Sequence, residues 1–267
     1  MVHSGINEHI IQTLFIALAF SVVVPLYVFH LLRLKLNVFD AGAVASAYGS
    51  VSAVTFISAA SFLEMNHTPF GGHMVAAMAL MEAPAIVVGV ILIRKYDKTS
   101  SEKGSLKKVL HEAFTNGSVL MILGSLAIGI IADSKQAEGI KSFTSDIFKG
   151  FLAIFLLEMG MVAAKRFKAF IQYGWFVSLF SILIPLINGT LAVFVTTFGN
   201  IDIGNRFMLA ILAASASYIA VPAAMRLAAP KADPGLYIPM ALGLTFPFNI
   251  TIGMPLYWML IQQFPSI

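Results

Sequence analysis

Two polar stretches interrupt apolar segments of this chain, and both have the composition of an anion site. The first is A-S-A-Y-G-S-V-S-A-V-T-F-I-S at Ala45–Ser58, and the second is A-A-S-A-S-Y-I-A-V-P-A-A-M-R at Ala213–Arg226. Pro222 has no N–H and its ring crowds the preceding turn, so we expect a kink or break just before it. A break leaves N–H groups free at the positive end of the half-helix that follows, and such groups suit an anion.

The residues that stand out are small or hydroxyl-bearing and lie at the two interruptions: Gly49, Ser50, Ser52, Ser215 and Ser217. Helix packing explains either stretch alone, because small residues let membrane helices approach closely and serines hydrogen-bond across them. Two interrupted segments at corresponding positions of two halves instead indicate a transporter's binding site. We therefore predict that the pair binds a substrate.

Glu82 lies in the middle of an apolar segment, where a carboxylate costs about 2.5–3.5 kcal/mol on insertion scales. Coordination of sodium and carriage of a proton are two functional explanations, and a hydrogen bond to a neighbouring helix is the structural one. Thr245 and Asn249, in the counterpart region of the second half, offer neutral oxygen atoms for sodium. Thr55 and Tyr218, beside the two interruptions, complete the candidate ion ligands.

Glu158 is a second carboxylate within an apolar segment, and it either lines the transport path or pairs with the basic residues that follow it. The six histidines have no metal-ligand spacing and the chain has no cysteine, so we expect no metal beyond sodium. Sequence patterns of hydrolases, metalloproteases and ATPases are absent. We therefore predict no catalytic residues, no cofactor and no enzymatic activity.

Composition places the chain in a membrane. Mean hydropathy is +0.87, and charged residues make up 11% of the chain, whereas soluble domains have about 25%. The apolar segments predict an all-α bundle with eight spans, at about Ile10–Leu32, Ala41–Leu63, His73–Ile93, Gly117–Ala132, Ile147–Ala164, Phe170–Phe198, Phe207–Ala229 and Tyr237–Gln262. A polar linker at 94–115 separates a first half of three spans, 1–93, from a second half of five, 116–267.

Loop charges support this arrangement of spans. Most of the 17 Lys and Arg residues fall in loops on one side, while Lys135, Lys141, Lys149 and Arg206 fall on the other. The basic side is expected in the cytoplasm, with both termini outside the cell membrane, which is the inner membrane in a bacterium. Because the basic residues lie in loops between apolar spans, the high isoelectric point does not indicate nucleic-acid binding.

A weak internal repeat relates the two halves. A shift of 163 residues places Ser52 on Ser215 and Pro84 on Pro247, so the first three spans correspond to the last three. The offset of five spans is odd, which predicts repeats of inverted topology. The same arithmetic predicts that two spans are missing from the front of the chain.

At these residues the chain resembles the sodium-dependent bicarbonate permeases first associated with cyanobacteria. The matching stretches include Y-G-S-V-S-A-V-T-F, M-E-A-P-A, L-E-M-G-M, A-S-A-S-Y-I-A-V-P-A-A-M-R and Y-I-P-M-A-L-G-L-T-F-P-F-N. Two departures stand out. Family members begin with about two more helices, which gives ten spans against eight here. Tyr218 stands where cyanobacterial members carry an aspartate in S-S-S-D.

The resemblance implies a fold of two five-helix inverted repeats, with a core domain moving against a gate domain. It also implies bicarbonate between the two helix breaks and sodium beside it, which makes anion-site candidates of Gly49, Ser50, Val51, Ser52, Ala53, Ser215, Ala216 and Ser217. A homotrimer is implied as well, and in some members control by a PII-like cytoplasmic protein. We therefore expect sodium-coupled uptake of bicarbonate, or of another small anion, by alternating access across the lipid bilayer.

Two other interpretations stay open. A transporter of the same architecture for another solute, such as a sodium/proton exchanger, would use Glu82 to carry the proton. A non-transporting membrane scaffold would bind a cytoplasmic regulator through the linker Arg94–Thr115 and carry no flux.

Overall fold

The computed structural model describes residues 8–97 and 174–266, together with scattered positions between 121 and 164. Helices and short connections make up all of these described residues, and none of them forms a strand. The scattered positions include helix α7 (Ser134–Lys141). About half of the residues in the expected spans Gly117–Ala132 and Ile147–Ala164, and the whole linker beyond residue 97, lie outside the described residues.

The first half contains the three expected spans, and the middle one is divided. Its helices are α1 (Glu8–Leu32), α2 (Val38–Gly49), α3 (Ala53–Met65) and α4 (His73–Tyr96). The side chain of Asn37 starts α2 by accepting hydrogen bonds from the N–H groups of Phe39 and Asp40. Helix α4 continues three residues past the predicted end of its span, so the linker begins after Tyr96.

The second half has the same plan. Its helices are α9 (Trp175–Thr197), α10 (Ile203–Ala214), α11 (Ala220–Ala228) and a last helix divided into α12 (Pro234–Ile238), η2 (Pro239–Thr245), α13 (Phe246–Phe248), η3 (Asn249–Gly253) and α14 (Met254–Gln263). Segments η2 and η3 are π-helical. Pro239, Pro247 and Pro255 each lie at or next to the start of one of these segments, where a missing N–H favours a wider turn.

Five helical segments among the described residues are long and apolar enough to cross a membrane: Glu8–Leu32, Val38–Met65, His73–Tyr96, Trp175–Thr197 and Pro234–Gln263. They coincide, within a few residues at each end, with five of the predicted spans. The predicted span Phe207–Ala229 corresponds to α10 followed by α11, two half-helices that are each too short to span alone. The all-helical, multi-pass fold is therefore confirmed.

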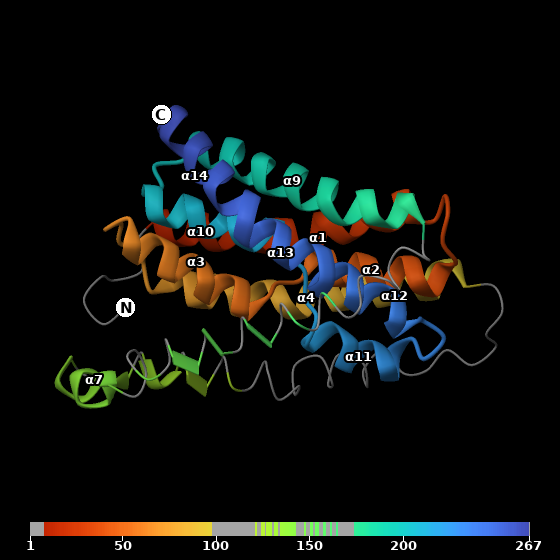
Figure 1. Ribbon diagram of the computed structural model, residues 1–267, viewed down its shortest axis with the longest axis horizontal. Helices are drawn as coiled ribbons and strands as arrows, with labels where there is room; N and C mark the ends of the chain where they lie inside the picture. Colours follow the sequence, from red (N-terminus) through yellow and green to blue (C-terminus); the bar gives the residue numbers. More distant parts are fainter. Residues whose placement is uncertain are drawn as a thin grey trace.

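The two halves run in opposite directions. In Figure 1, α2 followed by α3 runs from right to left, whereas α10 followed by α11 runs from left to right. The α1–α2 loop, the end of α4, and the end of α11 with its connection to α12 all lie at the right-hand end. These segments carry Arg33, Lys35, Arg94, Lys95, Arg226 and Lys231. The described basic residues that the sequence placed on one side of the membrane therefore gather at one end of the bundle.

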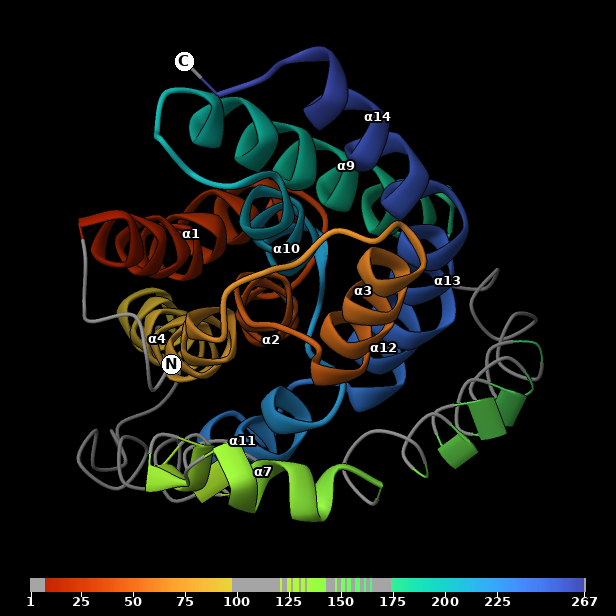
Figure 2. The same cartoon turned by 90° about the vertical axis from the view of Figure 1, so that its left-hand side faces the viewer.

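Helices α2 and α10 form the centre of the bundle, with α1, α3, α4 and α9 around them (Figure 2). Residues Ala41–Gly49 and Gly204–Ala214 are buried without exception. Small residues permit this packing, because a Cβ on Gly89 of α4 would overlap the Ser46 hydroxyl of α2. The two interrupted helices are thus held at the bundle axis.

Arg206 differs from the sequence prediction, which counted it among the loop charges. It lies in α10 and is completely buried. Its guanidinium donates to Val193 O and to the hydroxyls of Thr196 and Thr197, in the last turn of α9. A cation at the negative end of a helix is favourable, so Arg206 fastens α9 to α10.

Candidate functional site

Both predicted helix breaks are present. Helix α2 ends at Gly49 and α3 begins at Ala53, while α10 ends at Ala214 and α11 begins at Ala220. Pro222 is the third residue of α11, so the second break precedes it by a few residues. The first four N–H groups of a helix have no carbonyl partner within that helix, so proline is tolerated at this position.

The two breaks cross, and hydrogen bonds donated by backbone N–H groups connect them. The N–H of Ser52 donates to the Ser215 hydroxyl at 3.2 Å, and the N–H of Ser217 donates to Ala47 O at 2.8 Å. Ser52 and Ser215 are the residues that the 163-residue shift relates. The structure therefore brings together two residues that the predicted repeat pairs.

A serine at each break accepts a hydrogen bond from the first turn of the half-helix that follows. Ser52 is the N-cap of α3, and Ser217 lies two residues before Ile219, the N-cap of α11. Ser52 Oγ accepts from the N–H of Thr55 at 3.1 Å, and Ser217 Oγ accepts from the N–H of Val221 at 3.3 Å. Each hydroxyl uses its oxygen in this contact and keeps its own hydrogen for another partner. Both serines are buried, so that partner belongs to the interior of the protein.

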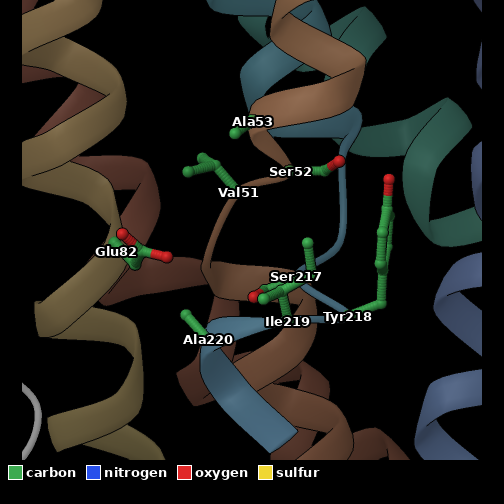
Figure 3. A pocket seen from close by; sticks show the side chains of 8 residues that line it. All are labelled: Val51, Ser52, Ala53, Glu82, Ser217, Tyr218, Ile219 and Ala220. Carbon is green, nitrogen blue, oxygen red and sulfur yellow. The ribbon is translucent and has the colours of Figure 1, made fainter. Parts of the chain in front are cut away.

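A cavity of about 50 Å³ lies at the crossing, lined by Val51, Ser52, Ala53, Glu82, Ser217, Tyr218, Ile219 and Ala220 (Figure 3). One water needs about 10–15 Å³ of such space, so the cavity has room for a few waters or for small ions of the same total size. The positive N-terminal ends of α3 and α11 both border it. Their first N–H groups lack helical partners, so the cavity suits an anion.

Glu82 of α4 forms the opposite wall. Its side chain is only 5% exposed and extends toward the two breaks in Figure 3. Its Oε2 atom is buried and makes no hydrogen bond within the described residues. A buried carboxylate without a partner is costly, and a cation or a hydrogen-bond donor in the cavity would supply that partner.

Tyr218 also lines the cavity. Its ring packs edge-on against Phe246, with 5.9 Å between the ring centroids. Its hydroxyl is buried and extends beside Ser52, away from Glu82, in Figure 3. Unlike the aspartate that the resemblance leads one to expect, Tyr218 brings no carboxylate to the second break.

Several predicted anion ligands support the crossing without lining the cavity. Gly49 permits a close approach to α1, because a Cβ there would overlap the Pro25 ring. The hydroxyl of Ser215 donates to Leu212 O at 2.8 Å while it accepts from Ser52. Ser50 and Ala216 are buried beside them, and the Ser50 hydroxyl makes no hydrogen bond among the described residues.

Thr245, a predicted sodium ligand, does not line the cavity. Its hydroxyl donates to Ser181 O at 2.7 Å and lies 2.7 Å from the Tyr48 hydroxyl, which therefore donates to it. Ser181 stands four residues before Pro185, so its carbonyl is the one that this proline leaves without a helical N–H. The Thr245 hydroxyl therefore supplies the hydrogen-bond donor that Pro185 lacks in α9, and its contact with Tyr48 connects this point to α2.

Asn249 and Thr55 have positions beside the crossing. The Asn249 amide donates to Ala214 O at 2.7 Å, at the end of α10, while its Oδ1 is buried without a partner among the described residues. The N–H of Thr55 donates a hydrogen bond to the hydroxyl of Ser52, the N-cap of α3. Neither residue lines the cavity. Glu158 is exposed and is not among the described residues that line the cavity.

Ile219 and Ala220 line the cavity although sequence reasoning did not select them. A signal for them exists, because proline is favoured in the first turn of a helix. Pro222 therefore marks a helix that starts one or two residues before it, and the start of that helix faces the ligand.

A known family of membrane transporters matches the chain, in agreement with its helical bundle and its crossed helix breaks. No curated protein sequence matches the chain. The family model described as the Na+-dependent bicarbonate transporter superfamily matches residues 1–262, which is nearly the whole chain. A multi-pass helical bundle with two crossed helix breaks agrees with a transporter. The chain therefore belongs to the Na+-dependent bicarbonate transporter superfamily.

Proposed function

We propose that this protein couples the entry of sodium to the uptake of bicarbonate, with the anion held in the cavity at the crossing. One observation carries the proposal: two helix N-termini and a buried carboxylate face one another across a space of about 50 Å³. The helix ends and the serine hydroxyls provide donors for the oxygens of the anion.

The carboxylate provides the coupling. Two unit negative charges about 5 Å apart repel each other by about 3 kcal/mol at an effective dielectric constant of 20, which is roughly a hundredfold in affinity. An anion beside ionised Glu82 therefore binds poorly alone. A sodium ion between or beside the two charges removes this penalty, so anion and cation enter together.

The transport cycle is alternating access. The described helices hold the site as a core, and we propose that this core moves against the spans expected near 117–132 and 147–164. The basic end faces the cytoplasm and both termini face the outside of the cell membrane, the inner membrane in a bacterium, in agreement with the gathering of basic residues at one end. A homotrimer and a PII-like regulator complete the proposal and rest on the family resemblance alone.

Uptake of labelled bicarbonate into cells expressing the full chain tests the proposal, with sodium and with potassium replacing it. Ser52→Trp and Ser217→Trp place an indole in the cavity and should abolish sodium-dependent uptake. Leu191→Trp, on an exposed position of α9, is the matched control and should keep it. Equal uptake in sodium and potassium, or uptake that survives both cavity variants, contradicts the proposal.

Sodium/proton exchange is the second candidate, and the unpartnered Glu82 carboxylate favours it. In that case Glu82→Gln abolishes sodium-driven proton movement, and the wild-type protein carries no labelled bicarbonate. A pH-sensitive dye inside sealed vesicles, together with the labelled uptake, separates the two candidates.

A further inference from the structure

The side chains around the central cavity offer several hydrogen-bond donors but one dedicated acceptor. The hydroxyls of Ser52 and Ser217 accept from the N–H groups of Thr55 and Val221 and keep their own hydrogens, and the N-termini of α3 and α11 add backbone N–H groups. An ionised carboxylate, in contrast, can only accept. The Glu82 carboxylate is that acceptor: the side chain is 5% exposed and directed toward the breaks (Figure 3), and its Oε2 atom makes no hydrogen bond among the described residues.

This arrangement matches an oxyanion that carries one hydrogen. Bicarbonate has two oxygens that only accept and one O–H that donates. The charged oxygens belong with the hydroxyls and the helix N-termini, and the O–H belongs with Glu82. We propose that Glu82 accepts the hydrogen of the substrate and thereby selects hydrogen-bearing oxyanions over oxyanions of the same shape without hydrogen, an inference that rests on the proposed occupancy of this cavity.

Nitrate is the informative comparison, because it is planar, carries one negative charge and has three oxygens but no hydrogen. In the same pose it presents an oxygen lone pair to the Glu82 carboxylate, with repulsion where bicarbonate makes a hydrogen bond. A site built to bind a substrate O–H can reject an analogue lacking it by about 10⁴-fold or more. We expect at least a hundredfold preference for bicarbonate, since other contacts are shared.

This role is compatible with the coupling role of the same residue. A carboxylate has two oxygens with about four lone-pair sites, so one oxygen can meet sodium while the other accepts the hydrogen. Glu82→Asp keeps a carboxylate and should keep the preference. Glu82→Gln keeps the size but adds an NH₂ donor, which can pair with a nitrate oxygen.

Calorimetric titration of the purified full chain with sodium bicarbonate and with sodium nitrate, at one fixed pH, tests the inference. Wild type and Glu82→Asp should bind bicarbonate at least a hundredfold more tightly than nitrate, and Glu82→Gln should reduce this ratio below about tenfold. Thr245→Val, at the repeat-related position outside the cavity, is the control and should leave the ratio unchanged even if uptake falls.

Two results overturn the inference: similar binding of nitrate and bicarbonate by the wild type, or an undiminished preference in Glu82→Gln. Both are distinct from failure of the proposed function. If the wild type binds no bicarbonate in sodium, the proposed function is wrong. If it binds bicarbonate in a sodium-dependent way and binds nitrate equally well, only the inference about Glu82 is wrong.

Discussion

Glu82 in the first half and Thr245 in the second are related by the same 163-residue shift that brings Ser52 against Ser215. The backbones around them have similar plans, but the side chains have different tasks. Glu82 lines the cavity and its Oε2 atom has no partner among the described residues, whereas the Thr245 hydroxyl is hydrogen-bonded to Ser181 O and Tyr48. The two halves therefore have similar backbones, but the first half supplies the carboxylate of the cavity and the second half supplies a hydroxyl that stabilises helix packing.

The serines at the crossing have the same role in both halves. The hydroxyls of Ser52 and Ser217 each accept from an N–H in the first turn of a half-helix beside the cavity, although the 163-residue shift does not relate them. Each half thus supplies one helix N-terminus and one capping hydroxyl. The symmetric elements bind the anion, and the asymmetric element, Glu82, provides the coupling.

The largest effect is expected for Glu82→Gln, which removes the element that distinguishes the halves. Sodium-dependent bicarbonate uptake should fall at least a hundredfold, because the charge that requires the cation is gone. The protein should also become more resistant to thermal unfolding, since a buried carboxylate without a partner opposes folding. Uptake and thermal unfolding are measured on the same preparation. A variant with lower thermal stability would indicate that Glu82 is instead a satisfied structural residue.

Thr245→Val tests the reinforcing half. The Ser181 carbonyl and the Tyr48 hydroxyl both lose their partner, so the free energy of unfolding should fall by about 1–3 kcal/mol. Bicarbonate affinity should stay within a few-fold of the wild type, because Thr245 does not line the cavity. Denaturant unfolding and calorimetric titration measure the two quantities. A large loss of sodium-dependent affinity with unchanged stability would show that Thr245 contributes to the sodium site.

Ser52→Ala and Ser217→Ala sharpen the comparison of the shared elements. Each removes a helix cap worth about 1 kcal/mol and one donor to the anion. We expect both variants to weaken bicarbonate binding by roughly tenfold, since a hydrogen bond to a charged group contributes about 1.5–3 kcal/mol at most. Titration of the two single variants gives the result. A strong effect in only one of them would show that the anion sits on one half-helix and not between two.

Tyr218→Phe should have the smallest effect. It removes only the hydroxyl, which lies beside the Ser52 hydroxyl, while the ring keeps its contact with Phe246. A neutral hydrogen bond contributes about 0.5–1.5 kcal/mol, so the dissociation constant for bicarbonate should rise by roughly two- to tenfold. Complete loss of binding would mean that Tyr218, and not Glu82, is the principal determinant.

Much of the fold follows from the sequence because its signals are local. Apolar length located the spans, and the small, serine-containing stretches together with Pro222 located the breaks. The cavity could be anticipated from the same residues, since half-helix N-termini must lie where the breaks are. Glu82 stood out for an equally local reason, as a charge in an apolar segment.

The remaining assignments depend on contacts between distant segments. Thr245 looked like a ligand because its repeat mate is Glu82, but Tyr48 and the proline interruption in α9 take its hydroxyl. Arg206 looked like a loop charge because it lies near a chain turn, yet α10 starts before it and buries it against α9. Such tertiary contacts cannot be read from composition or spacing.

The central claim is that anion and sodium share one site in which Glu82 makes each depend on the other. The direct test is the dissociation constant of bicarbonate, titrated calorimetrically at rising sodium with potassium keeping the ionic strength constant. Linkage requires that sodium tighten bicarbonate by the same factor as bicarbonate tightens sodium. We predict that the wild type binds bicarbonate roughly a hundredfold more tightly at saturating sodium and that Glu82→Gln loses this dependence. A wild-type dissociation constant that is the same in sodium and in potassium would contradict the account.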